Sequence, residues 1–343
     1  MNIVDIISGI EEFEVQYKDA STKVDLATEF WNRYNPQTVD LLRRHQYQEL
    51  RERMFRILRT CKQIDQESYK KIHKGHPYFF IGITSYRLGD YQTAISFFDA
   101  ALSEDLQTED KEERPTYLFF MLKGDEPRNA ARLETQLVES NVKRSIDYYN
   151  NQIAKNEDIC KLNIQDLQDV FIEYVLNNND DPGLRTLLTT FITFIVEWDI
   201  RNEHFDIGVN KGTSEPLLMH LFRGCVLFES LLKRNPFPKT KHEDQMNSLY
   251  TLITYYKDKM KVKFPGDSSS KNTDIDTLEK VLEELNRRTE KIDDSILMAY
   301  WLRNTLGHSL AWEVRIDQDS YQKLYFIVVT ACLHVINCMW RNP

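Results

Sequence analysis

The sequence predicts an all-α protein, and two observations carry this prediction. Glycine is scarce, with 11 residues in a chain of 343. Long segments place apolar residues at positions i, i+3, i+4 and i+7, which is the spacing of one face of a helix. No pair of alternating segments is joined by an Asn-Gly or Asp-Gly turn, so β-hairpins are not indicated. We therefore expect helices nearly throughout the chain.

The clearest element of the N-terminal half is a helical hairpin over residues 79–105, with the turn LGDY between two short helices. Gly82, Ala94 and Ala101 are small enough to let the two helices approach each other closely. Phe98 would then fill the groove between them. Two further segments have a helical pattern without these features: residues 41–65 and 128–156.

This hairpin resembles a tetratricopeptide repeat, a unit of two packed helices. One such repeat cannot bury its own apolar face, so the resemblance implies neighbouring helices that stack against it. The alternative is a helical hairpin inside an ordinary α bundle. The matching positions are Ile81 and Gly82 in the first helix, Gly89, Asp90 and Tyr91 in the turn, and Ala94, Phe98 and Ala101 in the second helix.

Two clusters of helix-breaking residues interrupt the pattern, NNNDDPG at 177–183 and DIGVNKGTSEP at 206–216. The second cluster is the preferred domain boundary, which divides residues 1–207 from residues 208–343. The apolar run Leu187–Trp198 is interpreted as a buried helix, with a strand as the alternative because of its β-branched content. This run is shorter than the ~20 residues that a membrane span needs, so no membrane association is predicted.

Five helix candidates follow the preferred boundary. Four to five antiparallel helices with mostly short connections make a helical bundle. The candidates cover residues 214–233, 243–262, 276–291, 295–312 and 318–340.

Composition excludes several classes of protein. The formal net charge of -9 and the pI near 5.5 argue against a general polyanion binder, so any nucleic-acid site must be local. The five cysteines include no C-x-x-C pair, so neither a disulfide framework nor a zinc ribbon is predicted. Together with an acidic N-terminus that does not look like a signal peptide, this fits a cytoplasmic protein.

Nucleotide-hydrolase, Rossmann and α/β-hydrolase motifs do not occur in the sequence. The segment HKGHP, residues 73–77, has a possible metal-ligand spacing but lacks a third ligand nearby, and a zinc site needs at least three. It is interpreted as a turn before the repeat-like hairpin. No metal and no other cofactor is predicted.

The segment YWLRNTLGHSLAWEV, residues 300–314, places polar side chains in an otherwise apolar helix. Asn304 and His308 are four residues apart and lie on one helix face. Arg303 is offset from His308 by about 140° around the axis, but its long side chain can reach that face. Gly307 costs a helix roughly 1 kcal/mol relative to alanine, which suggests that a partner helix or a ligand approaches closely there.

An arginine, a polar residue, three variable positions and a histidine form the signature of the HEPN superfamily, which this C-terminal bundle resembles over roughly residues 208–343. The matching residues are Arg303, Asn304 and His308. The segment 220–233 also looks like a first HEPN helix.

This resemblance implies a metal-independent RNA endonuclease. In such enzymes the ribose 2′-hydroxyl attacks the adjacent phosphate and leaves a 2′,3′-cyclic phosphate. His308 would act as general base or acid, Arg303 would stabilise charge on the phosphate, and Asn304 would orient the imidazole or the phosphate.

The resemblance extends to supporting residues and to assembly. Family members can carry a polar residue on an earlier helix that supports the active pair, and Glu229 is the candidate, with an exposed outer-face glutamate as the alternative. The family commonly forms its site across a two-fold interface, so a homodimer through the C-terminal bundle is expected. The cations that we expect to contact RNA are Arg287, Arg288 and Arg315 beside Arg303.

The resemblance also implies a regulated toxin or an antiphage-defence effector, and we expect the N-terminal helical region to bind a protein or peptide regulator. One alternative is a catalytically silent scaffold that dimerises through the bundle. Another is a helical adaptor unrelated to HEPN, in which Arg303 and His308 are structural and Arg303 pairs with Glu313 or Asp294.

Overall fold

The structure is a computed structural model that consists of helices, turns and connecting segments. No strand occurs in the residues that it describes, so the all-α prediction is confirmed. The described residues are 26–35, 39–178, 180–206, 214–237, 248–264, 275–288, 291–308 and 315–341. The chain divides into two compact units, an N-terminal unit of residues 1–136 and a C-terminal unit of residues 137–343.

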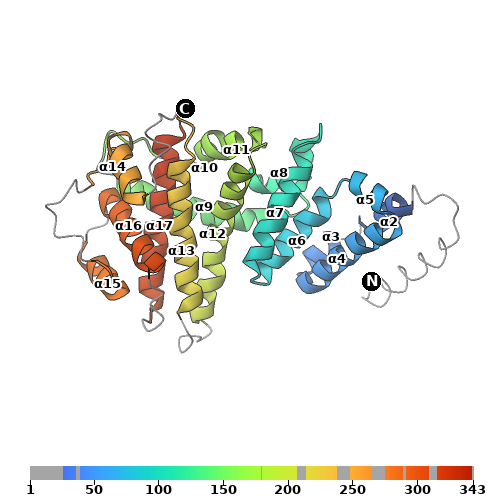
Figure 1. The fold of residues 1–343 in the computed structure, drawn as a ribbon, viewed down its shortest axis with the longest axis horizontal. Coiled ribbons are helices and arrows are strands. Elements are labelled where there is room, and N and C mark those ends of the chain that lie inside the picture. Colours follow the sequence, from blue (N-terminus) through green and yellow to red (C-terminus); the bar gives the residue numbers. More distant parts are fainter. Residues whose placement is uncertain are drawn as a thin grey trace. The chain divides into compact units, whose positions relative to one another are not determined.

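The N-terminal unit is built from helices joined by turns (Figure 1). Its core is rich in buried aromatic side chains. Phe98 stacks on Phe119, with ring centroids 5.4 Å apart, and Phe79 and Phe120 meet these rings edge-on or tilted. The helices are α2 (Leu26–Tyr34), α3 (Val39–Arg43), α4 (Tyr47–Ile64), α5 (Gln66–Lys71), α6 (Gly75–Arg87), α7 (Tyr91–Asp105), the 3-10 turn Lys111–Glu113 and α8 (Pro115–Phe120).

Helices α6 and α7 form the predicted hairpin. Gly89 in the turn has a φ of 78°, a conformation that glycine adopts without strain. A Cβ atom at Gly82 would lie 2.6 Å from the Phe98 ring, so the missing side chain is what lets the two helices approach each other. The close packing expected from the small residues of this segment is therefore confirmed.

The C-terminal unit contains the longest helices. Each of the five helix candidates after residue 207 coincides with a helix, α13 to α17, while residues 243–247 and 309–312 of these candidates lie outside the described residues. The helices are α9 (Arg132–Ile153), which begins in the N-terminal unit, α10 (Ile164–Leu167), the π-helical turn Gln168–Ile172, α11 (Glu173–Asn177), α12 (Pro182–Asp206), α13 (Glu215–Lys233), α14 (Leu249–Met260), α15 (Leu278–Arg287), α16 (Ile292–His308) and α17 (Gln318–Met339).

Helices α12, α13, α16 and α17 form the central layer of this unit (Figure 1). The run Leu187–Trp198 lies within α12 and is buried, so the helical interpretation was right and the strand alternative was wrong. The compact units divide inside α9, whereas the sequence placed the domain boundary after residue 207. Helix α12 precedes that predicted boundary and packs against α13 and α17.

Helix α17 is long and apolar enough to cross a membrane, judged by length and composition alone. Its most apolar window is 78% buried among the other helices, as in the core helix of a helical protein. The apolar surface of α17 is thus largely used in packing.

Two histidines are fully buried in the C-terminal unit and are held by hydrogen bonds. His220 Nε2 lies 2.8 Å from the Phe194 carbonyl oxygen, and His334 Nε2 lies 2.8 Å from that of Met260. Because a carbonyl oxygen can only accept, Nε2 carries the proton in both rings. Burial lowers the pKa of His220 to about 3 and that of His334 to about 4.

We predict that the C-terminal unit loses stability as the pH falls. A folded-state pKa below the unfolded value of ~6.5 means that the unfolded state binds more protons below that pH. Each buried histidine should lower the free energy of unfolding by about 2 kcal/mol at about pH 5 relative to about pH 7.5. Urea unfolding across this range measures the change. Replacing His220 with Gln should flatten the profile, and an unchanged profile would contradict the assignment.

Candidate functional site

Arg303 on α16 forms an ion pair with Glu229 on the neighbouring helix α13. The distance from Arg303 Nε to Glu229 Oε2 is 2.9 Å. The Glu229 side chain is 8% exposed and that of Arg303 is 31% exposed. The pair thus joins a nearly buried carboxylate to a guanidinium that still reaches the surface.

Lys233 is the second cation that binds Glu229, one turn further along α13. Its Nζ lies 2.5 Å from Glu229 Oε1, at the i, i+4 spacing that places side chains on one helix face. Burial raises the pKa of Glu229, but hydrogen bonds and charges from Lys233 and Arg303 outweigh burial and leave the pKa below its usual value. The carboxylate is therefore ionised at neutral pH and fixes the direction of Arg303.

Among the described residues, no side chain or carbonyl binds the terminal nitrogens of Arg303. Within the described part of the chain, Glu229 is the hydrogen-bonding partner of Arg303 and uses only Nε. A Cβ atom at Gly307 would lie 3.3 Å from Arg303 Nη1 and 3.6 Å from Phe222 Cε2. Gly307 thus lies against the guanidinium of its own helix, and a side chain there would require Arg303 to shift by a few tenths of an ångström.

The other two residues of the motif lie on the same helix. Asn304 is half-buried on α16. His308 is the last residue of α16, and its side chain lies outside the described residues, as does the segment 309–314 with Glu313. Asp294, one of the alternative partners expected for Arg303, binds Arg288 instead, at 3.1 Å.

The three cations proposed for RNA contact differ in their surroundings. Arg288 is bound by Glu284 and Asp294, and its guanidinium lies 4.6 Å from the centroid of the Trp301 ring. Arg287 is exposed beside Glu283 and Glu284. Arg315 is exposed, and no ion pair of Arg315 occurs among the described residues. Of the three, Arg288 is thus held in the structure by other side chains.

Sequence reasoning missed a buried carboxylate on α12. Glu197 is 1% exposed and binds Arg201, at 2.7 Å, and Arg223 of α13. A lone acidic residue inside the apolar run Leu187–Trp198, with Arg201 at i+4, was the available signal.

The comparisons with known proteins leave the motif without outside support: no family model, no curated protein and no solved structure matches the chain. Within the described residues, no group of three or more His, Cys, Asp or Glu side chains could hold a metal ion. The chemistry that this site offers is therefore a positioned guanidinium, which binds carboxylate or phosphate oxygens through paired N–H groups.

We predict that replacing Glu229 with Gln destabilises the protein by about 1–2 kcal/mol, because two cations lose the ionised partner of a nearly buried pair. Urea unfolding monitored by circular dichroism measures the change. Glu279→Gln on α15 is the control, since Glu279 is exposed. Equal stability of the two variants would mean that the Arg303–Glu229 pair contributes nothing.

Proposed function

We propose that the chain is a metal-independent RNA endonuclease of the HEPN type. The observation that carries the proposal is the Arg303–Glu229 pair. Arg303 lies on the helix that ends at His308 and is fixed by a nearly buried carboxylate. Within the described residues this contact uses only Nε, so the outer nitrogens face no other protein partner there. An arginine with a purely structural role would be expected to donate hydrogen bonds from more of its N–H groups to other protein groups.

The motif assigns one role to each residue. Arg303 binds a non-bridging phosphate oxygen and stabilises the charge that develops as the ribose 2′-hydroxyl attacks. His308 takes up or delivers the proton of that step. Asn304 orients the imidazole or the phosphate by hydrogen bonding. Glu229 positions Arg303 without touching the substrate.

We further propose that the enzyme is a homodimer through the bundle, so that two motif helices share one substrate. An exposed apolar face on α13 next to Arg303 supports this proposal. Met219 is 43% exposed and Val226 is 40% exposed, and Phe222 of the same face lies beside Gly307. A monomer gains nothing from apolar side chains in water at these positions.

In this proposal the N-terminal unit, with the tetratricopeptide-like α6–α7 hairpin, binds a protein or peptide that controls the nuclease. Such control suits a toxin or a defence effector, since an unregulated RNase would harm its host. A silent HEPN scaffold would have the same bundle and the same interface but no activity, and the cleavage experiment distinguishes the two.

We predict that the wild-type chain cleaves RNA in EDTA and leaves 2′,3′-cyclic phosphate ends. His308→Ala should lower the rate about 10²- to 10⁴-fold, and Arg303→Ala about 10²- to 10³-fold. Arg303→Lys keeps the charge but loses the planar fork and should fail to restore the rate. Cleavage of a labelled tRNA pool measures each rate.

The controls are Arg43→Ala and His45→Ala, two exposed residues of the same types in the N-terminal unit. Equal cleavage by all five variants would contradict the assignment of the site. Absence of cleavage by the wild type with and without its cellular partners would favour the silent scaffold.

We predict that Val226→Asp weakens dimerisation at least about 100-fold, because two-fold symmetry buries two unpaired charges in one interface. Light scattering coupled to size-exclusion chromatography measures the mass over a range of concentrations. Tyr255→Asp, at a position on α14 with similar exposure, should remain dimeric. A monomeric wild type at the highest concentration would refute the dimer.

A further inference from the structure

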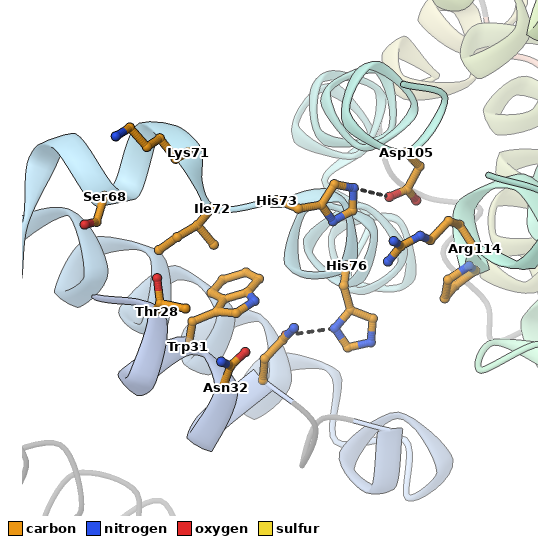
Figure 2. A pocket seen from close by; sticks show the side chains of 12 residues that line it. Thr28, Trp31, Asn32, Ser68, Lys71, Ile72, His73, His76, Asp105 and Arg114 are labelled. Carbon is orange, nitrogen blue, oxygen red and sulfur yellow. Dashed lines mark hydrogen bonds and ion pairs between the residues drawn. The ribbon is translucent and has the colours of Figure 1, made fainter. Parts of the chain in front are cut away.

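The N-terminal unit contains a cavity of about 670 Å³ that the proposed nuclease does not use. Residues of α2, α5, α6, α7 and α8 line it, together with the turn between α5 and α6 (Figure 2). Its volume is within the range of ~300–1,000 Å³ that is typical of sites for small organic ligands. The segment HKGHP was interpreted from the sequence as a turn, but only His73 and Lys74 lie in the turn, and α6 already begins at Gly75. The segment contributes His73 and His76 to the wall.

The buried carboxylate of Asp105 lies next to the His73 ring. Asp105, the last residue of α7, is 1% exposed, and its Oδ1 lies 3.0 Å from His73 Nε2. The contact lacks the alignment of a hydrogen bond, and neither oxygen of Asp105 accepts one from the described residues. A Cβ atom at Gly75 would overlap Oδ1, so glycine is needed there to admit the carboxylate.

His76 is held in one neutral form. Its Nδ1 lies 2.8 Å from the Asn35 Oδ1 atom, which can only accept, so Nδ1 carries the proton and Nε2 is an acceptor. Burial lowers the pKa of His76 to about 4. This ring therefore offers a ligand an acceptor beside the His73–Asp105 pair.

Cationic groups line the same cavity. Figure 2 shows the Arg114 guanidinium close to His73 and His76, while Lys71 lines the far edge of the cavity and its side chain extends away from them. Arg114 donates hydrogen bonds from Nε and Nη2 to Asp110 Oδ1. Its Nη1 donates to no other group among the described residues. Trp31 supplies a flat apolar wall between the two sides. Within the described residues, no set of His, Cys, Asp and Glu side chains here could bind a metal ion.

We propose that this cavity binds a nucleoside phosphate. A phosphate group accepts hydrogen bonds from Arg114 and His73, donors that a neutral ligand would leave unused. A planar base fits against the Trp31 ring, and its N–H groups match the acceptor nitrogen of His76. The ligand is thus a mononucleotide or a similar small organic phosphate. All these residues belong to the N-terminal unit, so the proposal stands independently of the nuclease site.

Isothermal titration calorimetry of the full chain tests this proposal with the four nucleoside 5′-monophosphates. Matching titrations with the free nucleosides and with inorganic phosphate separate the contributions of base and phosphate. We expect at least one nucleotide to bind more tightly than either fragment. His73→Gln and Arg114→Gln should each raise the dissociation constant about tenfold or more, which is the effect of losing one charged hydrogen bond.

The control variants locate the binding. Lys70→Gln removes a cation next to Lys71 that pairs with Glu67, and it should leave affinity unchanged. Because Arg303 is itself proposed to bind phosphate, Arg303→Ala reports whether the nucleotide binds at the nuclease site instead. Far-UV circular dichroism verifies the fold of each variant. Three results would overturn the proposal: no nucleotide binds, inorganic phosphate binds equally well, or affinity falls with Arg303→Ala and not with His73→Gln or Arg114→Gln.

Discussion

The close approach of three helices at Gly224 is the constraint on which the C-terminal unit depends. A Cβ atom there would overlap the Phe194 ring of α12 and lie 2.7 Å from Val328 Cγ1 of α17. Because Gly224 has no side chain, α13 can pack closely against both α12 and α17, with ridges of side chains on one helix fitting into grooves of the next. Any larger residue would push α13 outward, and Glu229, one and a half turns further along, would move with it.

Buried polar groups then fix how α13 is rotated and how far it is shifted along its axis. His220 binds the Phe194 carbonyl oxygen, and Arg223 binds Glu197, both of which belong to α12. Apolar contacts tolerate sliding, whereas an unpaired buried charge costs several kcal/mol, so these pairs allow one arrangement. Glu229 is thereby presented to Arg303 of α16. The pair that carries the proposed function rests on contacts made elsewhere on the same helix.

The N-terminal unit uses its glycines in two different ways. Gly82 admits the Phe98 ring and so determines the spacing of α6 and α7. Gly75, at the start of α6, admits the carboxylate of Asp105 instead of an apolar group. Gly82 thus allows close helix packing and nothing more. Gly75 leaves a carboxylate buried beside a cavity, and burying such a group does not by itself stabilise the fold.

The sequence by itself determined the helices of this protein, because helix formation depends on local periodicity and on breakers such as the cluster at 177–183. It also identified the residues of the Arg303 motif and Glu229. It left three possible partners for Arg303, namely Asp294, Glu313 and Glu229. Only the tertiary structure joined Arg303 to Glu229, 74 residues apart in sequence, and His73 to Asp105. Such pairs depend on the rotation and spacing of packed helices, which local periodicity does not encode.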